Sequence, residues 1–270
     1  MLRYNRRFRP RRTVTFLLAC LLLTSSMILP THAAGTGWYC ARAKNHVQPV
    51  ADPPLRAVEE CGGYYIDHTH ADPNASDKVV YLTFDAGYEN GNVAKVLDAL
   101  RDAGATGAFF ILGNLPERHP ELVTRMAEEG HLVCNHTYSH KNLCGAPGGA
   151  LTAELTRLED ACLERAGVEV AKYYRPPEGC FDEAMLKEAC AAGYKTVFWS
   201  CAYADWDNGR QPDPTAAKAK ILDNLHNGEV MLLHPTSATN AAILPDILRE
   251  ISAKGYRFGT LDELTGGEGR

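Results

Sequence analysis

The stretch VVYLTFDAG, residues 79–87, is an apolar run that ends in a carboxylate. A continuous run of Val, Tyr, Leu and Phe is typical of a strand that is buried on both faces of a sheet. Asp85 closes this run, although burying a carboxylate is costly unless its charge is paired or hydrogen-bonded. Asp85 is therefore either a cap at the strand end or an acid or base in a catalytic site.

Six further short apolar runs follow along the chain. They are residues 108–112, 131–134, 172–174, 196–199, 230–233 and 256–258. Between the runs, apolar residues recur with the period of a helix, as in Val93, Val96, Leu97 and Leu100. The glycines that follow helical stretches and mark their ends are Gly104, Gly130, Gly167, Gly193, Gly228 and Gly255.

Seven predicted strands thus alternate with helices in one domain. Repeated strand–helix units imply a parallel sheet. A domain of this length forms either a doubly wound open sheet or a reduced, distorted β/α barrel. Periodicity alone does not choose between these two α/β folds.

The chain is predicted to have three parts. Residues 1–34 join an arginine-rich start to an apolar run and then to THAAGTG, which is the layout of a signal peptide or, if retained, of an N-terminal membrane anchor. Residues 35–77 are irregular and are expected to pack on the domain as an extended segment. The catalytic domain is expected at residues 78–266. We therefore expect an exported protein that is secreted or anchored in the membrane.

Composition limits the partners. The chain has 270 residues, 45% of them hydrophobic, and a formal net charge of −5. The only strongly basic stretch is residues 3–12, inside the predicted signal. A mildly acidic domain offers no electrostatic footprint for nucleic acid, so we discount nucleic acid as a partner. We expect a monomer.

Nine cysteines are present, and removal of the signal would leave eight. Export and an even count permit disulfides. The pairings to test first are Cys40 with Cys61 and Cys134 with Cys144, although sequence does not determine connectivity.

Polar residues follow five of the predicted strands, at the end where parallel β/α folds place their chemistry. These positions are Asp85, NHTYSH at 135–140, RPPEG at 175–179, AYADW at 202–206 and His234. Five unrelated structural roles would rarely place five clusters of ionisable groups at the same end of the sheet.

Each cluster also has a structural reading. His136 and His140, four residues apart, would share one face of a helical turn and could hold a metal, but two solvated histidines would look the same. Arg175 is either a surface arginine or the counter-ion of Asp85. Asp205 could cap a turn, and His234 could be a hydrogen-bonded core histidine.

Together these motifs resemble the polysaccharide deacetylase family of carbohydrate esterases. TFDAG, HTYSH, RPPEG, ADW and LLH appear in the family's order, and the resemblance covers residues 78–264. It implies a distorted, reduced (β/α) barrel of about seven parallel strands. It also implies removal of acetyl groups from a polysaccharide by hydrolysis.

The resemblance implies roles for individual residues. Asp85 would be the general base, oriented by Arg175, and His234 the general acid, oriented by Asp205. The metal ligands would be His136 and His140. The residues that would contact substrate are Glu178, whose backbone N–H would stabilise the oxyanion, and Trp206 and Leu232, which would wall the acetyl pocket.

Two positions depart from the wider family. Ala86 stands where a second aspartate usually completes the metal site, and Glu178 replaces an aromatic residue. Two histidines alone make a poor cage, so the sequence leaves a divalent metal such as zinc open. Glu89, Asn90 and Asn92 are candidates for a substitute oxygen ligand.

The match narrows to one branch of the family. YLTFDAGYENG, FWSCAYADW and GWYCARAKNHVQP resemble the sporulation δ-lactam-biosynthetic de-N-acetylases. That branch also departs from aspartate at the position of Ala86. The resemblance implies action on muramic acid in peptidoglycan, leading to the δ-lactam of spore cortex, at the forespore. Its substrate would be a glycan strand whose stem peptide an upstream muramoyl amidase has removed.

Two alternatives remain open. One is a general peptidoglycan N-acetylglucosamine or chitin deacetylase. The other is an inactive cell-wall glycan-binding module, against which the joint presence of Asp85, Arg175, Asp205 and His234 argues.

Overall fold

A seven-stranded parallel sheet forms the centre of the fold in the computed structural model, which describes residues 35–267. Its strands are β2 (Lys78–Ala86), β3 (Ala108–Ile111), β4 (Leu132–Asn135), β5 (Ala171–Tyr174), β7 (Lys195–Thr196), β8 (Glu229–Leu233) and β9 (Tyr256–Gly259). The spatial order is β7-β5-β4-β3-β2-β8, and β9 pairs with the first half of β2. The prediction of an α/β fold with about seven parallel strands is confirmed.

The two ends of the sheet meet, so the sheet curls into a partly closed barrel. Beyond β7 the chain runs on to Cys201, which forms a parallel bridge with Met231 of β8. Only residues 195–196 form a ladder, so the strand predicted at 196–199 is mostly replaced by isolated bridges. Nearer the start of the strands, Tyr64 bridges Val197 and Ile66 bridges Glu229, so the N-terminal segment fills the gap between β7 and β8.

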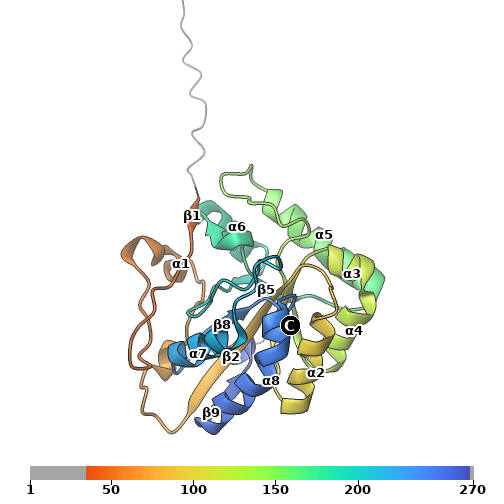
Figure 1. The fold of residues 1–270 in the computed structure, drawn as a ribbon. Coiled ribbons are helices and arrows are strands. Elements are labelled where there is room, and N and C mark those ends of the chain that lie inside the picture. Colours follow the sequence, from red (N-terminus) through yellow and green to blue (C-terminus); the bar gives the residue numbers. More distant parts are fainter. Residues whose placement is uncertain (1–34, 268–270) are drawn as a thin grey trace, which may run out of the picture. The chain divides into compact units, whose positions relative to one another are not determined.

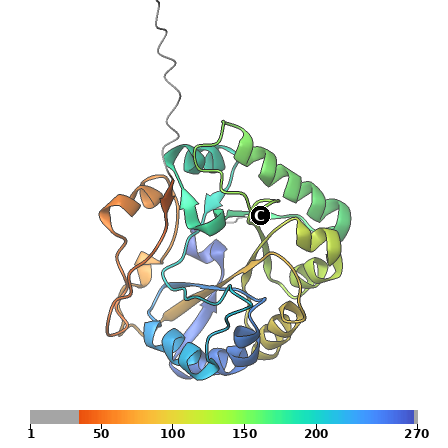
Figure 2. The same ribbon diagram turned by 45° about the horizontal axis from the view of Figure 1, so that its top comes forward.

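Helices cover the outside of the sheet (Figure 1). They are α2 (Val93–Ala103), α3 (Asn114–Arg118), α4 (Pro120–Glu128), α5 (Ala150–Ala166), α6 (Glu183–Ala191), α7 (Pro214–Asn224), α8 (Ala238–Ala253) and the short α9 (Leu261–Leu264). Figure 2 shows the longer helices arranged around one side of the barrel and the N-terminal segment on the other.

The N-terminal segment carries only short elements: β1 (Thr36–Gly37), η1 (Pro53–Leu55), α1 (Ala57–Glu60) and η2 (His68–His70). β1 pairs antiparallel with β6 (Cys180–Phe181), which follows a 3₁₀ turn, η3 (Pro177–Gly179). The segment is held to the barrel by main-chain bonds, among them Asp67 N–H donating to the carbonyl of Gly228 at 2.9 Å.

Gly228 lies in this contact and does not end a helix. Helix α7 ends at Asn224, and Gly228 sits in the turn before β8 with a φ of +75°. A Cβ at this position would collide with the carbonyl of Asp67. The prediction that Gly228 marks the end of a helix is therefore wrong, because close approach of two backbones also requires glycine.

Alternation along β2 separates the two faces of the barrel wall. Val80, Leu82, Phe84 and Ala86 pack in the cluster beneath the helices. Val79 and Tyr81 pack in the barrel interior with residues of the other strands. Successive side chains of a strand point to opposite faces, so Asp85 continues the interior row and reaches the mouth of the barrel.

The structure changes one cysteine pairing. Cys134 lies in β4 among the interior side chains, whereas Cys144 lies 2.6 Å from Cys180, sulfur to sulfur. Pairing of Cys134 with Cys144 is therefore wrong, because the strand holds Cys134 on the inner face of the barrel. The pairing of Cys40 with Cys61 stays a prediction.

No helix within residues 35–267 is both long and apolar enough to cross a membrane. The predicted signal or anchor at residues 1–34 lies outside the described residues.

Candidate active site

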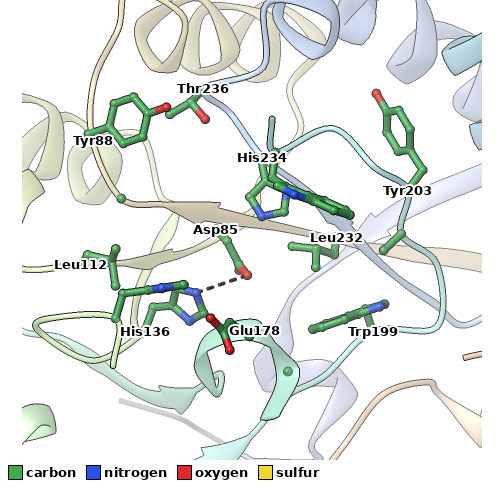
Figure 3. Close-up of a pocket in the computed structure, with 15 residues that line it drawn as sticks. Asp85, Tyr88, Leu112, His136, Glu178, Trp199, Tyr203, Leu232, His234 and Thr236 are labelled. Carbon is green, nitrogen blue, oxygen red and sulfur yellow. Dashed lines mark ion pairs between the residues drawn. The ribbon is translucent and has the colours of Figure 1, made fainter. Parts of the chain in front are cut away.

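A pocket of about 650 Å³ opens at the carboxyl ends of the strands. Its lining comes from the segments that follow β2, β3, β4, β5, β7 and β8. Figure 3 shows Asp85 near its centre, between His136 and His234. All the predicted site residues except Arg175 and Asp205 line this pocket, and those two lie directly behind it.

Arg175 is fully buried and holds Asp85. Its Nη1 donates to Asp85 Oδ1 at 2.8 Å, and its other nitrogens donate to Thr83 Oγ1 and to the carbonyls of Val197 and Phe198. Burial alone would raise the pKa of Asp85, but the charge of Arg175 and, more weakly, the neighbouring histidines lower it below its usual range. Asp85 is thus an ionised carboxylate held in one orientation, with Oδ2 free of Arg175.

His136 is oriented by the main chain of the same arginine. Its Nδ1 lies 2.8 Å from the carbonyl of Arg175, which only accepts, so Nδ1 carries the proton. Burial lowers the pKa of His136 to about 4, so the ring is neutral and Nε2 presents a lone pair. That lone pair faces Asp85 Oδ2 at 3.5 Å (Figure 3). Two acceptors face each other here, so a water that donates to both must lie beside the line that joins them.

His140 reaches the same pocket by a different route from the one predicted. Residues 136–140 form a loop rather than a helical turn, and Thr137 and His140 have positive φ angles of 70° and 56°. The loop is pinned by Asn135 Oδ1, which accepts from Thr137 N–H. The imidazole rings of His136 and His140 still lie edge to face, with centroids 5.0 Å apart. The expected helical spacing is wrong, but the two rings are neighbours.

These residues do not form a closed three-ligand metal site. No group of three His, Cys, Asp or Glu side chains within residues 35–267 is placed to hold a metal ion. Ala86 is buried on the outer face of the strand, in the cluster beneath the helices. The amides of Asn90 and Asn92 donate to the carbonyl of Thr236, and Glu89 accepts from Gly91 N–H, so none of the three candidate oxygens lines the pocket. Among the described residues, the two imidazoles are the donors that would hold a metal.

His234 stands on the other side of Asp85 and is held by Asp205. Its Nδ1 lies 2.7 Å from Asp205 Oδ1, and its backbone N–H donates to Asp205 Oδ2 at 2.8 Å. Burial would lower the pKa of His234, but the hydrogen bond to Asp205 and the charges of Asp205 and Asp85 raise it above its ordinary value. His234 therefore favours the protonated form and points Nε2 away from Asp205.

Asn240 supports this pair and was not identified from the sequence. Its Nδ2 donates to Asp205 Oδ2 at 2.6 Å and to the carbonyl of His234 at 3.1 Å, and Tyr203 donates its hydroxyl to Asn240 Oδ1. Asn240 lies in the first turn of α8, which is capped by Ser237. The signal that could have found it is SATN, a capping sequence that begins just after His234.

Glu178 lies in the turn after β5 with a φ of +58°, followed by Gly179 at +65°. A Cβ at Gly179 would collide with Trp199, so the turn packs tightly on that ring. Glu178 N–H forms no hydrogen bond within the described residues, and the residue lines the pocket. A left-handed conformation is costly for a non-glycine residue, and such strain is common at functional sites.

The pocket walls are largely apolar. Leu232 is buried on one side and Trp199 and Leu112 line it elsewhere, of which the sequence singled out only Leu232 (Figure 3). Trp206 is 61% exposed and lies at the mouth, with its ring centroid 6.3 Å from that of His234. Tyr88, also exposed, lies on the mouth and accepts from the amide of Asn208. A small apolar chamber thus opens between exposed aromatic rings.

A family model described as polysaccharide deacetylase matches residues 72–197. The chain is 36% identical to the peptidoglycan-N-acetylmuramic acid deacetylase PdaA of Bacillus subtilis over 84% of each protein. It is 33% identical to a peptidoglycan-N-acetylglucosamine deacetylase of Bacillus cereus, over 78% of this chain and 97% of that protein. The solved structure of Bacillus subtilis PdaA, a family 4 carbohydrate esterase, matches with a TM-score of 0.78 at 35% identity, covering 86% of this chain and 97% of that one.

Proposed function

We propose that the protein hydrolyses the N-acetyl group of muramic acid, because the chain belongs to the polysaccharide deacetylase family. The two relatives named above are both peptidoglycan deacetylases. It is a hydrolase of the carbohydrate esterase 4 group, acting on the acetyl groups of a polysaccharide. The observation that carries the proposed mechanism is the pairing, across one pocket, of an ionised Asp85 with a histidine whose pKa is raised.

Amide hydrolysis needs an activated water, stabilisation of the oxyanion and a proton for the departing amine. Asp85 Oδ2 accepts a proton from the attacking water as its oxygen bonds to the acetyl carbon. Glu178 N–H donates to the oxyanion that forms. His234 Nε2 donates a proton to the nitrogen as the C–N bond breaks, which releases acetate and the sugar amine. Leu232 and Trp206 bound the space for the acetyl methyl group and the sugar.

Members of this family typically depend on a divalent metal. His136 and His140 would hold one here, and a metal at that place would supply Lewis-acid stabilisation of the oxyanion. The third ligand is missing from the described residues, so we assign no step to the metal.

The muramic acid assignment is supported by the relative named as an N-acetylmuramic acid deacetylase. Removal of its acetyl group leaves an amine on the same sugar as the lactyl carboxylate, so closure of a δ-lactam is intramolecular and favoured by proximity. The carboxylate is free only where the stem peptide is gone, so an amidase must act first. We propose that the protein is exported, works as a monomer on the cell wall at the forespore and prepares spore-cortex lactam.

A second candidate is deacetylation of N-acetylglucosamine. It is supported by the Bacillus cereus relative and by the lining of the pocket, which contains no lysine or arginine among the described residues. A free lactyl carboxylate would favour a cation at the mouth.

The experiment is mass spectrometry of glycan fragments after the purified protein acts on peptidoglycan stripped of stem peptides, with and without a chelator. Acetate loss at muramic acid is the expected result, and loss only at glucosamine would establish the second candidate. Activity that the chelator removes and a divalent cation restores would place a metal in the reaction.

Asp85→Asn tests the general base. We expect acetate release to fall by roughly 10² to 10⁴, because the variant cannot accept the proton of water. Asp160→Asn, on the exposed side of α5, is the control and should be fully active. Binding of glycan strands should survive in both variants, and undiminished acetate release by Asp85→Asn would remove Asp85 from its role.

A further inference from the structure

Two cysteines lie side by side behind two segments that line the pocket, those of His140 and of Glu178 and Gly179. Cys144 belongs to the loop that carries His140, between β4 and α5, and Cys180 begins β6, directly after the turn of Glu178 and Gly179. Their Sγ atoms are 2.6 Å apart. Cys144 packs against the cluster formed by the N-terminal segment, α5 and α6, and Phe181, which follows Cys180, belongs to that cluster.

The neighbouring backbone holds the two sulfurs together. Gly145 N–H donates to Asp182 Oδ2 at 2.7 Å, so the residues that follow each cysteine are also joined. Residue Gly37 of β1 pairs with Cys180, and a Cβ at Gly35 would collide with both sulfurs. Two thiols do not pack at this distance, whereas the sulfurs of a disulfide lie about 2.05 Å apart.

This pair stands apart from the other cysteines. Within residues 35–267, no other two cysteine sulfurs are in contact. Cys162 is buried in α5, and Cys190 is exposed on α6. Proximity is therefore specific to the two residues that flank the candidate active site.

We propose that Cys144 and Cys180 form a disulfide that clamps the His140 loop to the turn of Glu178. The two thiols lose two protons and two electrons to an external disulfide, such as oxidised glutathione or a protein oxidant of the exported compartment, which becomes two thiols. The bond joins residues 36 apart in sequence. It goes beyond the proposed function, since it concerns the covalent state of the chain and not its substrate.

The clamp has a consequence for the pocket. His140 and Glu178 both line it, and each has a positive φ that the surrounding structure must hold in place. With the bond broken, the loop is tied to the turn only through single contacts, such as Asn142 Nδ2 with Glu178 Oε2 at 3.5 Å and Gly145 with Asp182. Reduction should therefore loosen the wall where the oxyanion is proposed to form.

The test is peptide mapping of the full purified chain. One sample is incubated with oxidised glutathione and one with dithiothreitol, free thiols are alkylated, and both are digested without further reduction. The expected result is one cross-linked peptide that contains Cys144 and Cys180 in the first sample only. Alkylation of both residues after oxidation, or a link from either to another cysteine, would overturn the proposal.

Melting temperature and acetate release give a second test of the disulfide. Reductant should lower the melting temperature of the wild-type protein by roughly 5–15 °C, the size expected for a loop of this length in a domain of this size. The variant Cys144→Ser/Cys180→Ser should melt low under both conditions, and Cys190→Ser should behave as wild type. Acetate release should fall severalfold with reductant in the wild type but not in the double variant.

The two proposals fail separately. A cross-linked peptide in a protein that releases no acetate from any glycan would leave the disulfide standing and remove the proposed function. An active protein whose melting temperature responds to reductant as strongly in the double variant as in the wild type would remove the disulfide and leave the proposed function standing.

Discussion

Two buried carboxylates on paired strands behave in opposite ways. Asp85 lies near the end of β2, and Glu229 begins β8, where it pairs in register with Val80. Arg175 lies 2.8 Å from Asp85, and the pKa of Asp85 is lowered. Glu229 is fully buried with no cationic Lys or Arg partner among the described residues, and burial raises its pKa to about 8.

The histidines follow the same contrast. His234, at the mouth of the barrel, pairs with Asp205, and its pKa is raised. His226, at the opposite end, lies 3.3 Å from Glu229, but burial lowers its pKa to about 4. Its Nε2 instead contacts Ser200 Oγ at 2.8 Å. Burial without a charge partner makes Glu229 and His226 neutral. At the mouth of the barrel, a partner of opposite charge keeps Asp85 and His234 ionised for acid–base chemistry.

Arg175→Met removes that partner and should have the largest effect. Asp85 would be left buried without a counter-ion, so its pKa should rise, as that of Glu229 has. We expect acetate release to fall by about 10³ and the free energy of unfolding by about 3–5 kcal/mol. Denaturant unfolding and an acetate assay measure the two losses.

The double variant Arg175→Met/Asp85→Asn is the control for this change. It removes the unpaired charge as well, so it should unfold less readily than Arg175→Met alone. If the two proteins are equally unstable, the loss comes from the other hydrogen bonds of Arg175 and the comparison with Glu229 fails.

Asp205→Asn should have an intermediate effect. Without the carboxylate, burial should dominate and the pKa of His234 should fall. Acid catalysis is lost as pH rises through that pKa, so the alkaline limb of the pH–rate profile should move to lower pH. Acetate release at neutral pH should fall by about 10². Asp207→Asn, an exposed carboxylate in the same loop, is the matched control, and an unshifted limb in Asp205→Asn would contradict the assignment of His234 as the acid.

Glu229→Gln should have the smallest effect on activity, and its effect should appear only as a pH dependence of stability. The carboxyl of Glu229 keeps its proton to about pH 8 in the folded state, whereas the unfolded chain loses it near the ordinary value. The folded wild type therefore loses stability as pH rises between those two values. Relative to wild type, the variant should gain about 1.4 kcal/mol per pH unit in that window and level off above pH 8.

Unfolding curves from pH 5 to pH 9 measure this difference, with the exposed position Glu164→Gln as the control for loss of one carboxylate. A flat difference would mean that Glu229 is ionised inside the fold. Acetate release should be unchanged, because Glu229 lies at the opposite end of the barrel from the pocket.

The sequence predicted the strands and the mouth well because both rest on local patterns. Each apolar run became a strand or a bridge, and the residue types at the strand ends met around one pocket. Asp85 and His234 could be found in this way since Asp85 lies at the end of β2 and His234 directly follows β8. The rule that chemistry gathers at the carboxyl ends of parallel strands carries that inference.

What the sequence could not predict depends on contacts between distant segments. Asn240 reaches Asp205 only because α8 begins beside the loop after β7. Cys144 meets Cys180 because the loop after β4 lies against the start of β6, a contact that the sequence, which left the pairing of Cys144 open, does not reveal. The approach of His140 to His136 likewise depends on two left-handed residues, Thr137 and His140, that no helical period describes.

The way in which residues 64–67 fill the gap between β7 and β8 bears on the timing of folding. Tyr64 and Ile66 emerge early in synthesis, but their bridge partners, Val197 and Glu229, lie far along the chain. Contacts of such long sequence separation form slowly, because a large loop must close before they contribute. In a nascent chain the gap between β7 and β8 therefore stays open until β8 has been synthesised, so the barrel closes only when nearly the whole domain is present.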